Sequence, residues 1–199
     1  MIEYIRGKIV ELTPATATIE TADGLGYLLN ISLNTYASLE GRETARLLVH
    51  EAIREDAWVL YGFSDERERS LFRALIGVSG VGAATARIIL SSYSAVELES
   101  VISSGDVRAL KNVKGIGAKT AERIIVDLRD KIKPGDDTLL EGVSLGRANR
   151  SPEAMDEALA ALVMLGFTRT QSQKVLKKLF DAEPTLKVDV AIKKALAVL

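Results

Sequence analysis

The chain has 199 residues, of which 47% are hydrophobic and 27% charged, a composition typical of folded globular proteins. It contains no cysteine and one histidine, which excludes disulfides, thiol catalysis and cysteine-ligated zinc and disfavours a histidine-rich metal site or a Ser-His-Asp triad. The N-terminus lacks the pattern of a signal peptide, and no apolar run approaches about 18 residues, so the sequence predicts a soluble, cytoplasmic protein without a membrane segment.

Charge is distributed unevenly along the chain, although the net charge is only −1. Residues 1–63 carry 5 basic and 9 acidic side chains, whereas residues 64–133 carry 12 basic and 9 acidic. Within residues 107–133 there are 8 basic and 3 acidic side chains. This local surplus fits a phosphate-binding face, but it fits a solvated helical surface equally well, so charge alone does not decide the function.

The first 63 residues have the pattern of short β-strands. Alternating and β-branched side chains predict strands over residues 2–10, 17–21, 26–31, 45–50 and 58–61. A hairpin turn is expected at Asp23-Gly24. About five short strands in this length favour a closed barrel of the OB type, and a fragment of a β-sandwich is the alternative.

From residue 64 onward the apolar residues repeat at helical spacing. Residues 64–65 are expected to cap the first helix, and Ser94 with Glu97 has the form of a capping box. The helical region ends near Lys133, because the Pro-Gly pair at residues 134–135 stops a helix.

The last third of the chain is expected to be a small helical module on a tether. Residues 134–150 contain few large apolar side chains and predict a flexible linker. Ser151-Pro152 can begin a helix, and residues 168–171 are expected to cap another. Three short helices are predicted over residues 152–165, 169–180 and 187–198. The predicted fold class is therefore α+β and multidomain, with regions at residues 1–63, 64–133, 134–150 and 151–199.

An internal repeat is the strongest functional signal in the chain. Residues 75–86 recur as residues 110–121, at an offset of 35 residues. Each copy has the pattern Val-x-Gly-apolar-Gly-x-x-Thr-Ala between two helical segments, the arrangement of a helix-hairpin-helix.

The repeated pattern predicts two phosphate-binding hairpins. Two glycines around one apolar residue permit a tight turn and leave backbone N–H groups uncovered, and the apolar residue turns inward. A helix begins at each turn, so its unpaired N–H groups and positive dipole end face an anion without reading bases. Packing alone is the alternative role, which two copies disfavour. The residues expected to bind phosphate are Gly80, Val81, Gly82, Ala84, Thr85, Gly115, Ile116, Gly117, Lys119, Thr120 and Arg123.

Other phosphate-binding motifs do not fit these turns. A P-loop has glycine immediately before its lysine, whereas Ala118 precedes Lys119. A dinucleotide fingerprint has a third glycine where Thr85 and Thr120 stand here, and it follows a strand, whereas both turns follow helices. No nucleotide site is expected.

Two motifs add to the order of the predicted parts: Arg-Glu-Asp-Ala-Trp-Val-Leu-Tyr-Gly-Phe at residues 54–63 and Gly-Ile-Gly-Ala-Lys-Thr-Ala-Glu-Arg-Ile-Ile at residues 115–125. With these motifs and this order of parts, the whole chain resembles the RuvA family of Holliday-junction-binding proteins. The resemblance implies a homotetramer that holds a four-way junction open, or an octamer when two tetramers enclose it. The implied partners are a RuvB-type hexameric ATPase and a junction resolvase. The chain itself would have no catalytic residue, cofactor or metal.

The resemblance also implies roles for residues outside the hairpins. Glu55 and Asp56 match an acidic pin that repels phosphates at the crossover, and a solvated turn is the alternative. The last 49 residues resemble a motor-binding domain and, at the level of fold, ubiquitin-associated (UBA-like) domains. The implied partner surface consists of Leu162, Leu165, Phe167 and Leu196, for which core packing is the alternative.

The first hairpin departs from the family pattern, because Ala84 stands where relatives often carry a basic residue and where the second hairpin has Lys119. Backbone donors survive this change, so the first hairpin is expected to bind with less electrostatic attraction. Candidates to compensate are Arg87, Lys114, Arg123 and Arg129, and for each of them an ordinary surface role is the equal alternative.

Three side chains of the predicted barrel have less specific interpretations. His50 is expected to have a structural role. Trp58 and Tyr61 can stack on bases, but core or subunit packing is favoured.

Two other functions stay open from the sequence. One is general duplex or single-strand binding through the barrel face. The other is a docking fragment of a DNA nuclease or ligase, which would need further carboxylates near Glu55 and Asp56 for a metal.

Overall fold

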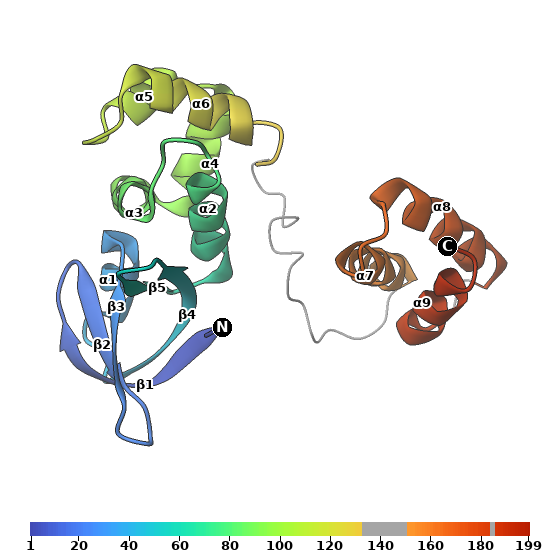
Figure 1. Cartoon of the computed structure of the whole chain (residues 1–199), viewed down its shortest axis with the longest axis horizontal. Helices are drawn as coiled ribbons and strands as arrows, with labels where there is room; N and C mark the ends of the chain where they lie inside the picture. The colour runs from blue at the N-terminus through green and yellow to red at the C-terminus, as the bar shows by residue number, and fades with distance from the viewer. Residues whose placement is uncertain (133–150, 184–185) are drawn as a thin grey trace. The chain divides into compact units, whose positions relative to one another are not determined.

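The computed structural model describes residues 1–132, 151–183 and 186–199, and no side chains at residues 151–153. The chain forms two compact units, Met1–Leu140 and Glu141–Leu199 (Figure 1). The predicted linker at residues 134–150 lies outside the described residues. No helix in the described ranges has the length and apolar character needed to cross a membrane.

The first unit begins with a closed barrel, as predicted. Its strands follow the order β1-β2-β3-β5-β4, and β3 pairs with β5 in parallel while the other pairs are antiparallel. A five-stranded barrel of this kind is the OB type, so the sandwich alternative is wrong. The strands are β1 (Tyr4–Leu12), β2 (Thr16–Glu20), β3 (Gly26–Asn30), β4 (Thr44–Ile53) and β5 (Trp58–Phe63).

Strand alternation places the larger apolar side chains inside the barrel. The buried residues include Ile5, Ile19, Leu29, Leu47 and Leu60. β1 and β2 approach so closely at Gly7 that a Cβ atom there would lie 2.0 Å from the carbonyl oxygen of Glu20. Only glycine fits at this position, because any side chain would collide with the backbone of β2.

Helix α1 (Leu33–Leu39), between β3 and β4, was not predicted. It has seven residues, and only Thr35 and Leu39 are buried, so it is too short to show an apolar period. The side chain of Ser32 caps it by accepting a hydrogen bond from the Thr35 backbone N–H.

Five helices follow the barrel and confirm the predicted helical region. Asp65 caps the first of them, and both hydrogen bonds of the Ser94–Glu97 capping box are present, as expected. The helices are α2 (Glu66–Ile76), α3 (Ala83–Ser92), α4 (Ala95–Ser104), α5 (Val107–Lys111) and α6 (Ala118–Leu128).

The core of the helical region includes side chains from β4 and β5 and is separate from the core inside the barrel. The ring of Phe72 on α2 packs 5.0 Å from the ring of Tyr61 and 4.9 Å from that of Phe63. Tyr61 is thus a core residue. The ring of His50 lies 5.3 Å from Phe72, and burial, with smaller effects of Arg73 and Arg69, lowers the pKa of His50. A neutral, packed imidazole agrees with a structural role.

Buried polar groups also join the helices to the barrel. The guanidinium of Arg69, almost fully buried, donates to the carbonyl oxygens of Glu3 and Val49 and forms ion pairs with the carboxylates of Glu3 and Glu66. Arg87 donates to the carbonyl oxygens of Ala15 (2.9 Å) and Ile31 (3.5 Å). Hydrogen bonds and ion pairs between residues that are distant in the sequence therefore hold the barrel and the helices together.

Glu68 is a buried carboxyl group within this contact. It accepts hydrogen bonds from the hydroxyls of Ser32 and Thr35, the latter at 2.6 Å. Burial, the largest effect, raises the pKa of Glu68 from its ordinary value of 4.5. The folded protein therefore holds this proton more tightly than the unfolded chain, so its uptake favours folding as the pH falls.

Replacing Glu68 with glutamine is expected to remove this pH dependence. Above the ordinary carboxyl pKa the wild type loses stability as the pH rises through the raised pKa, because an ionised carboxylate becomes buried, whereas the E68Q variant has no such group. Urea denaturation of both proteins at a series of pH values from about 4.5 upward measures the difference. Parallel stability profiles would contradict this account of Glu68.

The second unit is a three-helix module, as predicted. Its helices are α7 (Ser151–Met164), α8 (Arg169–Ala182) and α9 (Val188–Leu196), around a core that includes Leu159, Leu176 and Phe180. The predicted cap of α8 is wrong in its detail. Thr168 is the N-cap residue, but its hydroxyl donates to the side chain of Gln171 at 2.7 Å and does not accept from the backbone.

Ser172 carries an unsatisfied hydroxyl in this core. Its side chain is fully buried, and its oxygen has no hydrogen-bond partner among the described residues. Ser172→Ala is expected to stabilise the module by about 1 kcal/mol, because it removes a buried polar group without a partner. Thermal unfolding of the full chain measures the change, and Gln173→Ala, at an exposed neighbouring position on α8, is the control that should show no comparable gain. A lower melting temperature for Ser172→Ala would show that the hydroxyl is bonded in solution.

Candidate nucleic-acid interface

The two glycine turns have nearly the same backbone conformation. Gly80 and Gly115 adopt φ of 91° and 90°, in the left-handed region that favours glycine. Gly82 and Gly117 follow with φ/ψ of −87°/166° and −81°/168°, and each is the N-cap of a helix, α3 or α6. The sequence repeat is thus a structural repeat.

The apolar residue of each turn belongs to the fold. The side chains of Val81 and Ile116 are buried, and their backbone N–H groups donate to the carbonyl oxygens of Val78 (3.0 Å) and Val113 (3.1 Å). Neither the side chain nor the N–H group of these two residues is available to a phosphate. Their role is to hold the turn.

The first amides of α3 and α6 have no partner within the helix. The first helical bonds run from Ala86 N to the carbonyl of Gly82 (2.9 Å) and from Ala121 N to that of Gly117 (3.0 Å). Neither N-cap makes a side-chain hydrogen bond, and no acidic residue lies in either first turn. The N–H groups of residues 83–85 and 118–120 are therefore unpaired, which makes both helix ends candidate sites for an anion.

Nothing in the fold requires glycine at positions 82 and 117. Their φ values suit any residue, and a Cβ atom at either position would have no atom within 4 Å. The open space lies at the N-cap, beside the free amides. A missing side chain there fits the close approach of a ligand to the backbone.

The two turns lie next to each other. Arg123 on α6 donates to the hydroxyl of Ser79 in the first turn at 3.4 Å. The hydroxyl oxygen of Thr120 is 3.9 Å from the position that a Cβ atom of Gly80 would occupy. The repeat therefore places two helix ends without side-chain caps next to each other.

The second turn carries more positive charge than the first. Lys111, Lys114 and Lys119 are exposed around it, whereas Ala84 is exposed at the position equivalent to Lys119. Among the side chains expected to compensate, Arg87 is bonded to barrel carbonyls, while Arg123 reaches the first turn. Arg123 is the better candidate for phosphate binding at that turn.

Comparison with known proteins assigns the chain to a family. Family models described as "RuvA N terminal domain", "SAM-like Helix-hairpin-helix tandem" and "RuvA, C-terminal domain" match residues 1–62, 72–130 and 153–199. Proteins of Bacteroides fragilis and Bacteroides thetaiotaomicron are 52% identical to the chain over 98% of each sequence, and one of Porphyromonas gingivalis is 46% identical over the whole of both. The chain belongs to the RuvA family. Each of these relatives is named "Holliday junction branch migration complex subunit RuvA".

The residues that resemble the acidic pin of the RuvA family lie at the end of a hairpin. Glu55 and Asp56 are exposed between β4 and β5, and Arg54 N donates to the Ala57 carbonyl at 2.8 Å to close the turn. In the described part of the chain, no group of three or more His, Cys, Asp or Glu side chains could hold a metal ion. The further carboxylates that a metal-dependent nuclease would need near Glu55 and Asp56 are thus not present among the described residues.

Trp58 and Tyr61 lie in different environments, although base stacking and packing were the predicted alternatives for both. Tyr61 is 8% exposed and lies in the core, whereas Trp58 is 63% exposed and faces Ile53 across the β4–β5 pair. The odd spacing between the two residues along β5 explains this difference, because alternate residues of a strand point to opposite faces.

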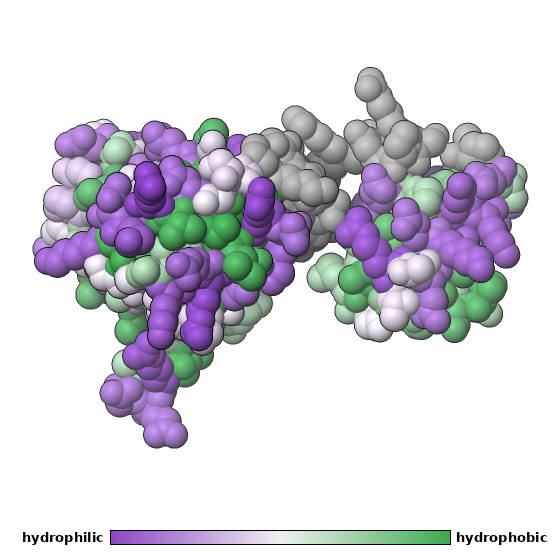
Figure 2. Space-filling view, turned by 90° about the horizontal axis from the view of Figure 1, so that it is seen from above, coloured by the Kyte–Doolittle hydropathy of each residue, from purple (hydrophilic) through white to green (hydrophobic). Residues whose placement is uncertain are grey.

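The candidate partner surface of the RuvA-family C-terminal domain is only partly exposed. Leu165 and Leu196 are exposed, Phe167 packs against the core, and Leu162 is fully buried. For Leu162 the alternative of core packing is therefore correct. Met164, which is not among the predicted partner residues, is 76% exposed beside Leu165. Hydrophobic patches are visible on the second unit in Figure 2.

Proposed function

We propose that the chain binds four-way (Holliday) junction DNA as a homotetramer and recruits a RuvB-type hexameric ATPase for branch migration in recombination and repair. The observation that carries the proposal is the pair of adjacent, uncapped helix ends in a chain whose relatives bear the branch-migration name. The chain is the non-catalytic, DNA-binding subunit and acts in the cytoplasm. ATP hydrolysis belongs to the partner.

Each hairpin holds a phosphate of one strand. The free amides at residues 83–85 and 118–120 donate to phosphate oxygens, the hydroxyls of Thr85 and Thr120 add donors, and Lys119 and Arg123 add charge. Gly80 and Gly115 shape the turns, and Gly82 and Gly117 leave room for the backbone of the DNA. Because amides do not distinguish bases, the protein recognises DNA structure and not sequence.

The remaining sites act at the centre and at the periphery of the complex. Glu55 and Asp56 of four protomers repel phosphates at the crossover and keep the strands apart. Leu165, Phe167 and Leu196 contribute to the surface for the ATPase. A second tetramer that encloses the junction, and a junction resolvase, are further partners in this proposal.

A mobility-shift titration tests the function. The purified chain is expected to bind a four-way junction more tightly than a duplex or a single strand of equal length, and to lose affinity steeply as salt is raised. The mass in solution should be that of four copies, or eight on DNA. Equal binding of the three DNAs would favour a general DNA-binding protein, and Mg²⁺-dependent cleavage or joining by the chain alone would favour the nuclease or ligase alternative.

The paired substitution Glu55→Gln with Asp56→Asn tests the pin. Junction affinity is expected to stay equal or to rise, because two carboxylates that repel phosphates have been neutralised. The rate of branch migration with the partner ATPase should change. Junction titrations and a strand-exchange assay measure the two effects, and a loss of binding would rule out the pin assignment.

A further inference from the structure

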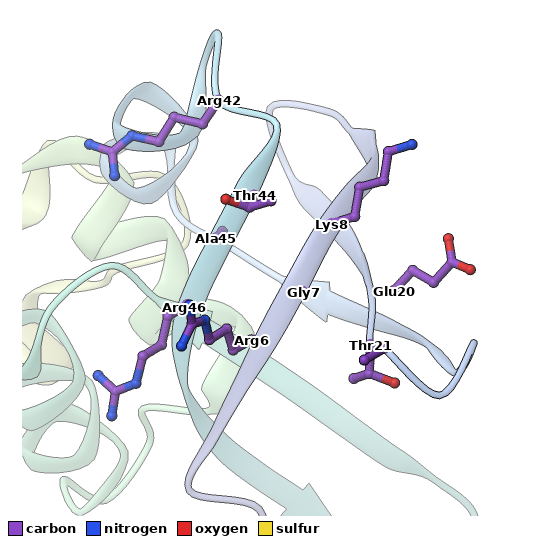
Figure 3. Close-up of a pocket in the computed structure, with 10 residues that line it drawn as sticks. Arg6, Gly7, Lys8, Glu20, Thr21, Arg42, Thr44, Ala45 and Arg46 are labelled. Atoms are coloured by element: carbon purple, nitrogen blue, oxygen red, sulfur yellow. The ribbon is translucent and has the colours of Figure 1, made fainter.

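A groove on the outside of the barrel collects most of the positive charge of the barrel region. It has a volume of about 670 Å³ and lies over β1 and β4, with residues 20–22 along one side (Figure 3). Four of the five basic residues among residues 1–63 line it, although that region has more acidic than basic side chains. These four are Arg6, Lys8, Arg42 and Arg46.

Strand geometry places like charges directly opposite one another. Arg6 on β1 pairs with Arg46 on β4, and both side chains are exposed on the outer face. Like charges at opposed positions destabilise a strand pair unless an anion lies between them. Gly7 and Ala45 pair between the charged residues, so small residues form the floor of the groove.

The basic side chains of the groove are not neutralised within the protein. Across the described residues, none of the four forms an ion pair with a carboxylate. Glu20, the one acidic residue of the groove, is in register with Lys8, so the arginines are left without an opposed acid. The guanidinium of Arg46 lies 4.2 Å from the ring centroid of Tyr4, a cation–π contact that fixes it in place with its N–H edges free.

We propose that this groove is a second DNA-binding site, which takes the phosphodiester backbone through Arg6, Arg46 and Arg42. Arginine binds phosphate oxygens in a bidentate manner, and an open groove with several cations suits a chain of phosphates better than a single carboxylate. The site is separate from the hairpins, since none of its residues belongs to α2–α6. This inference rests on the proposed function in one respect, which is that the anion bound in the groove is DNA.

The test is a titration of the full chain with linear duplex DNA at a series of salt concentrations. For Arg6→Gln with Arg46→Gln, affinity should fall, and the slope of log K against log salt should become shallower by about 0.9 for each phosphate that the variant no longer binds. The matched control, Lys177→Gln with Lys178→Gln on α8, removes the same charge from exposed positions elsewhere and should leave the slope unchanged.

A labelling experiment locates the DNA directly. The chain has no cysteine, so Thr44→Cys provides a single attachment point for a photo-crosslinker at the edge of the groove. Crosslinks to duplex DNA are expected from this position and not from Ser100→Cys, an exposed position on α4.

Two results would overturn the proposal. One is an unchanged affinity and salt slope in the arginine variant. The other is a change in the mass of the DNA-free protein, which would make the groove a contact between copies of the chain. A different result would contradict the proposed function itself: the wild type would bind the four-way junction no better than the duplex.

Discussion

Replacing Gly82 and Gly117 with aspartate is expected to leave the protein as stable as the wild type, or slightly more stable, and almost unable to bind DNA. Both glycines are N-caps with φ values that any residue can adopt and with open space at the Cβ position. Aspartate is a better N-cap than glycine by a few tenths of a kcal/mol, because its carboxylate accepts from the free amides. The same carboxylate occupies the amides that would otherwise bind a phosphate, and its negative charge repels the DNA.

The expected loss of affinity follows from the bonds removed. Hydrogen bonds to a charged group contribute about 2 kcal/mol, so losing one phosphate at each of two hairpins should weaken binding by about three orders of magnitude. Junction titration and thermal unfolding of the same samples measure the two opposite effects. The control, asparagine at both positions, caps the helices without the negative charge and separates repulsion from occupation of the amides. Unchanged DNA affinity in the aspartate variant would refute the phosphate sites.

Replacing Arg69 with methionine is expected to destabilise the first unit by about 2–4 kcal/mol. The arginine side chain is almost completely buried between the helices and the barrel, and its removal leaves two carboxylates and two carbonyl oxygens without their donor. The cost comes mainly from the two carbonyl oxygens, which lose a buried donor, because the partly exposed carboxylates of Glu3 and Glu66 can be hydrated by water instead. Methionine fills a similar volume, so the loss reflects the polar contacts and not a cavity.

Denaturant unfolding of the full chain measures this effect. Arg73→Met is the matched control, since Arg73 lies one turn further along α2 and is exposed, and its replacement should cost little. Equal stability of the two variants would mean that the buried contacts of Arg69 contribute no net stability. DNA binding by the folded fraction of Arg69→Met should stay normal, because Arg69 is not at the hairpins.

Features encoded within a short stretch of sequence were predicted well. The two glycine turns, the capping box at Ser94 and the strand alternation of the barrel each depend on residues within a few positions of one another. Helix α1 was missed because seven residues are too few to establish a period.

Features that combine distant residues could not be predicted. The ion pair of Arg69 with Glu3 and the groove formed by Arg6 and Arg46 depend on which strands become neighbours, and the sequence pattern alone does not determine that. Arg87 is one of several candidates for phosphate binding from the sequence, yet it donates to the carbonyl oxygens of Ala15 and Ile31, which are distant in the chain. Leu162 and Leu165, three positions apart on one predicted helix, differ in burial because the packing of three helices decides which face is covered.

In the proposed function both helix ends bind phosphate through backbone amides, and this has a consequence for how a duplex moves. Each base pair that advances brings a chemically equivalent phosphate to the same N–H groups, so the energy of the bound state repeats along the DNA with little dependence on composition. The bound DNA then has evenly spaced energy minima along its length. A motor that pushes DNA through the protein works mainly against the small barrier between neighbouring positions, and the spacing of those positions is that of the DNA itself.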